Sequence, residues 1–208
     1  MSETLLIHLK YCLTPTNRIN NAAIVVRDGA ILAVGGSSAF SQTDQFHVIE
    51  MPDCYALPGF VDTRIYGAGG FDCMHAHTDR NMAGMSRVLA AHGVTSFLPT
   101  TQTSDARRLH EIISALADLC DQEAPGAVPV GIHVEGPFIS PKKRGAHPPQ
   151  HIRPIDLAEA TALLEAGRGK IKIFTYAPEL DHAIELTALL KLPGSPPAWA
   201  IPWPASGP

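Results

Sequence analysis

A short stretch in the middle of the chain, residues 131–138, carries an imidazole and a carboxylate at a spacing that could do chemistry. Side chains two positions apart on a β-strand share a face, so a strand here would point His133 and Glu135 the same way. A carboxylate beside an imidazole suits zinc or a hard metal ion. The loop that follows, residues 142–147, is basic and suits an anion. The alternative is an ordinary core strand followed by a solvated basic turn.

Composition limits the kinds of protein that this chain can be. Its 208 residues are 45% hydrophobic and 17% charged, which is typical of a folded globular protein. A net charge of −4 gives no general attraction to nucleic acid or membranes. The four cysteines lack Cys-x-x-Cys spacing, which favours free thiols over a disulfide framework. There is neither a signal-peptide pattern nor an apolar run near the roughly 20 residues that span a bilayer. We therefore expect a cytoplasmic protein.

Short strands are expected through residues 1–56, and strand–helix alternation from residue 57 onward. The Asp28-Gly29 dipeptide predicts a hairpin turn, and the simplest interpretation of residues 1–56 is part of a small β-sandwich. Alternation of strands and helices favours an α/β fold with a parallel sheet. The expected strands lie near residues 57–62, 94–99, 129–135 and 170–176, and the expected helices near residues 79–92, 105–121, 155–167 and 180–191.

Four motifs in a fixed order carry a resemblance to a known family. The runs 57–62 (Leu-Pro-Gly-Phe-Val-Asp), 93–100, 133–138 (His-Val-Glu-Gly-Pro-Phe) and 176–179 follow one another, each separated by a helix-length segment. This pattern resembles the amidohydrolase superfamily and, within it, the N-acetylglucosamine-6-phosphate deacetylases, over about residues 5–190. The third run, with its Lys-Arg-Gly-Ala-His continuation, is its most specific part.

The resemblance implies a (β/α)8 barrel, of which this chain holds about four units. Such barrels typically need about 250 residues, so residues 57–191 would form the first half of one. Residues 192–208 contain six of the 18 prolines, both tryptophans and no charged residue. Dense proline excludes a helix or a central strand. We expect the family pattern to stop near residue 190, with either a frameshifted reading frame or a natural proline-rich linker beyond it.

The same resemblance assigns site residues. It makes Glu135 the carboxylate ligand of one divalent metal ion, zinc or iron being the expected identity. It places His147, Gly136 and Arg144 at the substrate. The remaining metal-binding histidines and the catalytic aspartate of the family have no counterpart up to residue 191, so no residue of this chain is assigned as catalytic.

The chain departs from the superfamily at the end of the first barrel strand. Many amidohydrolases carry His-x-His there, whereas this chain has Arg64-Ile65-Tyr66, which indicates one metal ion at most. Arg64 would supply either a fixed positive charge or a structural ion pair. His75 and His77, in the following loop, could bind a metal adventitiously or belong to a loop on the substrate side.

The function implied is metal-dependent hydrolysis of N-acetyl-D-glucosamine 6-phosphate to D-glucosamine 6-phosphate and acetate, in an incomplete form. The partner would be a small amino-sugar phosphate, and family members are usually homodimers. Two alternatives stay open. One is another cyclic-amide amidohydrolase, such as a dihydroorotase or an allantoinase, and the other is a non-catalytic fragment that needs a complementing chain.

Overall fold

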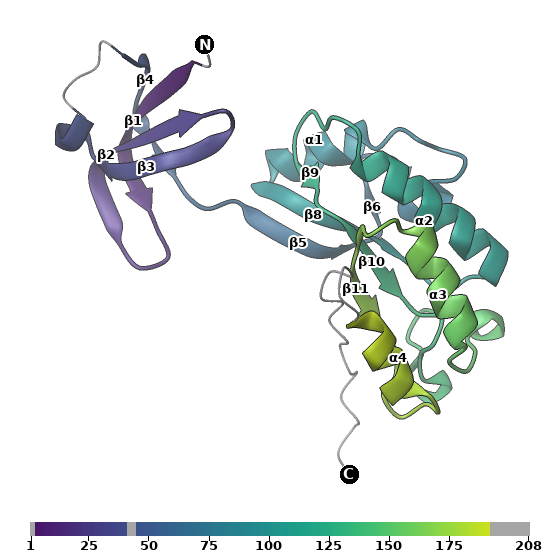
Figure 1. Cartoon of the computed structure of the whole chain (residues 1–208). Coiled ribbons are helices and arrows are strands. Elements are labelled where there is room, and N and C mark those ends of the chain that lie inside the picture. The colour runs from purple at the N-terminus through teal and green to yellow at the C-terminus, as the bar shows by residue number, and fades with distance from the viewer. Residues whose placement is uncertain (1–2, 41–44, 192–208) are drawn as a thin grey trace. The chain divides into compact units, whose positions relative to one another are not determined.

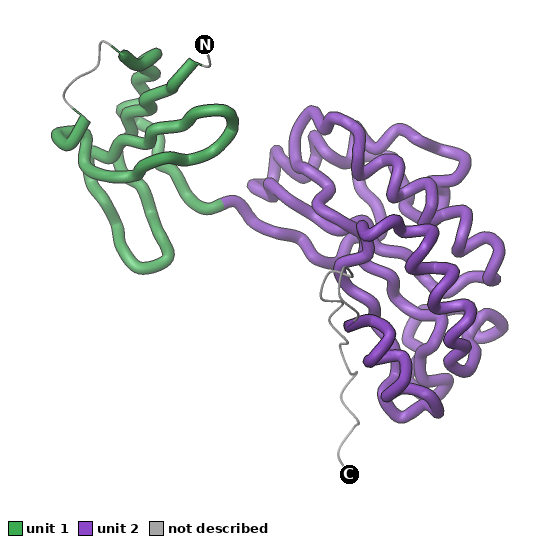
Figure 2. Tube along the Cα trace, in the orientation of Figure 1, with its two compact units in different colours: residues 1–58 green, residues 59–208 purple. Residues whose placement is uncertain are grey.

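The computed structural model describes residues 3–40 and 45–191, which divide into two compact units. Unit 1 spans Met1–Pro58 and unit 2 spans Gly59–Pro208 (Figure 2). The proline-rich segment 192–208, expected to be foreign to the fold, lies outside the described residues. No described helix is long and apolar enough to cross a membrane.

Unit 1 is built on a four-stranded sheet. The strand order is β3-β2-β1-β4, with β1 antiparallel to β2 and parallel to β4. The predicted hairpin is confirmed, because β2 and β3 pair antiparallel around Asp28 and Gly29, both of which have positive φ. The strands are β1 (Thr4–Leu13), β2 (Arg18–Arg27), β3 (Ala30–Gly36) and β4 (His47–Ala56). The small β-sandwich stays a prediction.

Unit 2 is an α/β unit around a parallel sheet, as the alternation of strands and helices predicted (Figure 1). The sheet order is β11-β10-β8-β5, so strands that follow one another along the chain lie side by side, and β9 pairs with β8. The strands are β5 (Phe60–Ile65), β8 (Val94–Thr101), β9 (Val128–Pro129), β10 (Ile132–Glu135) and β11 (Ile171–Thr175). Closure into a barrel stays a prediction.

Four helices connect and cover these strands: α1 (Ala83–Ala91), α2 (Ala106–Cys120), α3 (Leu157–Ala166) and α4 (Ala183–Leu190). A two-residue hairpin, β6 (Gly67–Ala68) with β7 (Phe71–Asp72), precedes α1. The α2 helix shows why the sequence folds this way. Leu109, Ile112, Leu116 and Leu119 recur every three or four residues and are all buried. Asp105 caps α2, its carboxylate accepting a hydrogen bond from the backbone N–H of Arg108.

Two predicted boundaries were wrong. β5 begins at Phe60 and not at residue 57, because Pro58 cannot donate to a strand ladder. The strand expected over residues 129–135 is divided into β9 and β10 at Gly131. A Cβ at Gly131 would lie 2.7 Å from the carbonyl oxygen of Lys170, so the backbones approach closely at this point.

Candidate functional site

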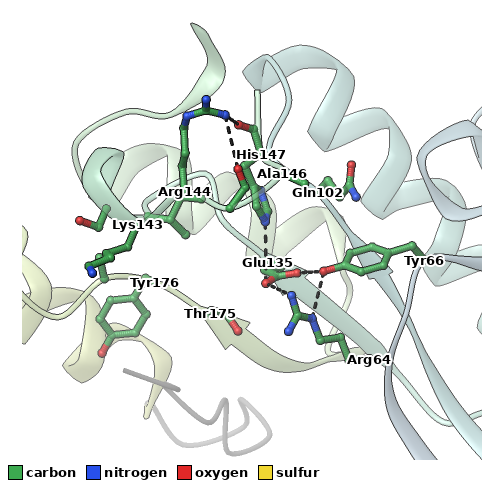
Figure 3. Close-up of a pocket in the computed structure, with 14 residues that line it drawn as sticks. Arg64, Tyr66, Gln102, Glu135, Lys143, Arg144, Ala146, His147, Thr175 and Tyr176 are labelled. Carbon is green, nitrogen blue, oxygen red and sulfur yellow. Dashed lines mark hydrogen bonds and ion pairs between the residues drawn. The ribbon is translucent and has the colours of Figure 1, made fainter. Parts of the chain in front are cut away.

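A cavity of about 210 Å³ opens at the carboxyl ends of β5, β8, β10 and β11 (Figure 3). Its walls come from these strand ends and from the basic loop after β10. The lining residues are Arg64, Tyr66, Gln102, Glu135, Ile139, Ser140, Lys143, Arg144, Gly145, Ala146, His147, Thr175, Tyr176 and Ala177. Ligands of parallel α/β proteins bind at this edge of the sheet.

Glu135 is the last residue of β10, and its side chain reaches the floor of the cavity. It is only 5% exposed, so its charge needs partners. Nη2 of Arg64 donates a hydrogen bond to Oε1 of Glu135 at 2.7 Å, and the hydroxyl of Tyr66 donates to Oε2 (Figure 3). Arg64 and Tyr66 are two positions apart at the end of β5 and reach the same carboxylate.

His147 reaches Glu135 from the basic loop. Its Nε2 lies 3.7 Å from Oε1 of Glu135. Nδ1 accepts a hydrogen bond from the backbone N–H of Thr103 at 3.2 Å and lies 2.8 Å from the hydroxyl oxygen of Thr103. Because Nδ1 is an acceptor, the proton of a neutral ring sits on Nε2 and points toward the carboxylate.

Protonation states in this cluster follow from its contacts. Burial raises the pKa of Glu135, but the nearby His147 ring, the hydrogen bond from Tyr66 and the charge of Arg64 outweigh burial and lower that pKa overall. Burial and the hydrogen bond to Glu135 raise the pKa of Tyr66 to about 12. At neutral pH Glu135 is therefore an anion, and Tyr66 keeps the proton that it donates.

Arg144 and Gly136 occupy different places. Arg144 lines the cavity, and its Nη1 donates to the carbonyl oxygen of His147 at 3.1 Å, which holds the basic loop together. Gly136 does not line the cavity. It has a φ of +76°, and a Cβ there would lie 2.2 Å from the hydroxyl oxygen of Thr103. Substrate contact by Gly136 stays a prediction, whereas its place in the turn beside Thr103 is clear.

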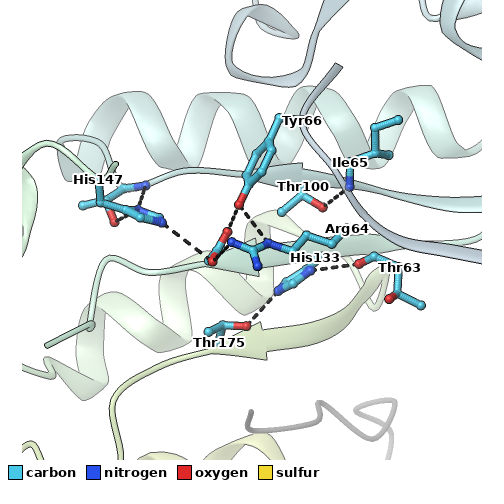
Figure 4. A network of polar contacts seen from close by, with 10 residues as sticks. Thr63, Arg64, Ile65, Tyr66, Thr100, His133, His147 and Thr175 are labelled. Atoms are coloured by element: carbon cyan, nitrogen blue, oxygen red, sulfur yellow. Dashed lines mark hydrogen bonds and ion pairs between the residues drawn. The ribbon is translucent and has the colours of Figure 1, made fainter. Parts of the chain in front are cut away.

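His133 does not line the cavity, and its ring lies between Thr63 and Thr175 (Figure 4). Its Nδ1 donates to the carbonyl oxygen of Thr63 at 2.9 Å, and its Nε2 lies 2.8 Å from the hydroxyl of Thr175. Burial lowers its pKa, which favours the neutral ring. His133 thus ties β10 to the ends of β5 and β11.

The histidines of the loop after β5 are not part of the cavity. Nδ1 of His75 lies 3.0 Å from the carboxylate of Asp72, and neither His75 nor His77 lines the cavity. Tyr66, in contrast, was given no role from the sequence. Its position two residues after Arg64 carried the same strand-face signal as the pair His133 and Glu135.

The described residues do not by themselves fit a metal ion. They contain no group of three or more histidine, cysteine, aspartate or glutamate side chains placed to hold one. Zinc sites usually use three or four protein ligands. Both oxygens of Glu135 already accept hydrogen bonds. The arrangement instead suits a small polar ligand that carries negative charge, because the cationic side chains of Lys143 and Arg144 line one wall of the cavity.

A parallel α/β unit with a charged cavity at its strand ends is the form of many small-molecule sites, and comparison with known proteins narrows the class. No protein-family model matches the chain. The N-acetylglucosamine-6-phosphate deacetylase of Bacillus subtilis is 36% identical over 195 residues, covering 92% of this chain and 48% of the relative. The human enzyme of that name is 39% identical over 153 residues, covering 70% of this chain and 37% of the relative.

Solved structures agree with the sequence comparison. A variant of N-acetyl-D-glucosamine-6-phosphate deacetylase from Mycobacterium smegmatis, in complex with N-acetyl-D-glucosamine 6-phosphate, superposes with a TM-score of 0.77 at 30% identity. The match covers 90% of this chain and 47% of that structure. The resemblance to the N-acetylglucosamine-6-phosphate deacetylases is therefore confirmed. The chain spans about half the length, or less, of the curated relatives that it matches.

Proposed function

We propose that this chain is the part of an N-acetylglucosamine-6-phosphate deacetylase that binds the amino-sugar phosphate, in the cavity at the carboxyl ends of β5, β8, β10 and β11. The observation that carries this proposal is the cavity itself. An ionised carboxylate forms its floor, and cationic side chains of one loop form its wall. The names of the relatives point to the same class of ligand.

Lys143 and Arg144 are the proposed phosphate contacts. Both line the cavity, and neither forms an ion pair with a carboxylate in the part of the chain that the structure describes. Charge-assisted hydrogen bonds from lysine and arginine are strong and well suited to phosphate. Glu135 and His147, on the other side, offer a carboxylate acceptor and an Nε2–H donor for sugar hydroxyls or the acetamido group.

Hydrolysis is proposed only for the longer enzyme. Deacetylases of this superfamily generally depend on a metal ion, and we propose Glu135 as the carboxylate that this part of the fold would contribute. Zinc and iron are both compatible with such a ligand. We further propose that the sheet of unit 2 is the first half of a (β/α)8 barrel, and that homodimerisation is a property of the longer enzyme.

The test is calorimetric titration of the whole chain with N-acetylglucosamine 6-phosphate, with N-acetylglucosamine and inorganic phosphate as comparison ligands. We expect the sugar phosphate to bind more tightly than either N-acetylglucosamine or inorganic phosphate. Lys143→Met should weaken its binding at least several-fold through loss of a phosphate contact. Lys142→Met is the matched control, because Lys142 belongs to the same loop but does not line the cavity. Equal affinities for the wild type and Lys143→Met, or no binding of the sugar phosphate, would contradict the proposal.

A further inference from the structure

Both oxygens of the buried Glu135 carboxylate are engaged by side chains from the end of β5. Arg64 donates to Oε1 at 2.7 Å and Tyr66 donates to Oε2. Arg64 also bonds to its neighbour, since its Nε donates to the hydroxyl oxygen of Tyr66 at 3.0 Å. The three side chains therefore form a closed set of contacts in which one positive and one negative charge balance.

A metal ion at Glu135 would have to break this set. It would need to displace Arg64 or Tyr66 from a carboxylate oxygen and then sit beside the guanidinium. Two like charges a few ångströms apart repel strongly in a half-buried site.

Few other side chains near Glu135 could act as metal ligands. His147 is the nearest imidazole, with its Nε2 at 3.7 Å. His133 holds its two ring nitrogens against Thr63 and Thr175. Within the described residues Glu135 and His147 are the two side chains left to ligate an ion, fewer than the three that zinc sites usually have.

We infer that Arg64 is the resident counter-ion of Glu135 in this chain and balances the charge that a divalent metal ion balances in metal-dependent deacetylases. Arg64 is a positioning residue: its two hydrogen bonds hold the carboxylate of Glu135 and the hydroxyl of Tyr66 at the cavity floor. The inference does not depend on which sugar phosphate the cavity binds.

A double-mutant cycle in the whole chain tests this inference. Wild type, Arg64→Met, Glu135→Gln and the double variant are unfolded with urea at pH 7. We expect the double variant to lose less stability than the sum of the single variants, with a coupling of about ten-fold in the unfolding equilibrium constant. Additive losses would overturn the inference, because a counter-ion and its partner must be energetically coupled.

A zinc titration of the same proteins provides the second readout, since an ion that binds only the folded state raises its unfolding midpoint. Zinc should raise the unfolding midpoints of wild type and Glu135→Gln equally, through histidines elsewhere in the chain. It should raise the midpoint of Arg64→Met more, because that variant frees the carboxylate of Glu135 beside His147. A zinc-dependent shift of the wild type that Glu135→Gln abolishes would overturn the inference. Should Glu135→Gln not fold, equal zinc shifts in wild type and Arg64→Met would overturn it as well. Loss of sugar-phosphate binding would refute the proposed function and leave both readouts unaffected.

Discussion

Replacement of Gly136 by alanine tests whether the turn after β10 holds the site through Thr103. Gly136 has a φ of +76°, where a residue with a Cβ costs roughly 1–2 kcal/mol. The added Cβ would lie 2.2 Å from the Thr103 hydroxyl oxygen and push that hydroxyl away from His147. A lost hydrogen bond costs about 0.5–1.5 kcal/mol more. We therefore expect Gly136→Ala to lower the free energy of unfolding by about 1.5–3.5 kcal/mol.

Gly145→Ala is the matched control. Gly145 also has a positive φ, +58°, but a Cβ there would meet nothing within 4 Å, so only the backbone cost of about 1–2 kcal/mol applies. The assay is urea unfolding followed by circular dichroism at 222 nm, because the described α-helices all belong to unit 2. Thr103→Ala removes the clashing oxygen, so its combination with Gly136→Ala should cost less than the sum of the two. Equal losses for Gly136→Ala and Gly145→Ala would refute the reasoning.

Three further changes test the core, a helix cap and an ion pair. Leu116→Ala empties a fully buried position of α2 and should cost about 2–5 kcal/mol in urea unfolding, whereas Ile184→Ala, at a side chain 84% exposed, should cost under about 0.5 kcal/mol. Asp156→Ala removes the carboxylate that accepts hydrogen bonds at the start of α3 and should lower stability by about 1 kcal/mol in the same assay; no change would contradict the cap. A hydrogen bond from Arg80 is the main cause that lowers the pKa of Asp118. The ionised Asp118 therefore stabilises the fold at pH values above its ordinary pKa of 3.8, and this contribution is lost as the pH falls below that value. The stability difference between wild type and Asp118→Asn should therefore shrink in thermal melts below about pH 4, and a difference that grows on acidification would contradict the assignment.

Local sequence signals determine much of unit 2. Strand and helix alternation was visible because α2 has buried residues at helical spacing and a capping aspartate, Asp105, before it. The division at Gly131 was not visible, because it depends on the close approach of the Lys170 backbone, which is distant in sequence. The start of β5 differs in kind, because Pro58 is a local signal that a strand ladder cannot begin before Phe60. Closure of the sheet into a barrel depends on pairing at its two outer strands, and no local pattern within residues 57–191 predicts that pairing.

The site was predictable only in part, for a similar reason. The common strand face of residues 133 and 135 did not give them common roles: Glu135 reaches the cavity, whereas His133 is bonded between Thr63 and Thr175. The bond between Arg64 and Glu135 joins residues 71 positions apart, so neither residue's neighbours in sequence predict it. Whether Arg64 supplies a fixed charge or an ion pair was left open from the sequence; in the structure it forms an ion pair with Glu135 and lines the cavity.

The most direct test of the account is one sample of the purified chain, assayed for deacetylation of N-acetylglucosamine 6-phosphate, for binding of that compound and for bound metal. The account predicts saturable binding of the sugar phosphate, no turnover and no stoichiometric metal, because Glu135 is bonded to Arg64 and the described residues do not complete a metal site. Turnover with near-stoichiometric metal, both abolished by Glu135→Gln, would contradict it.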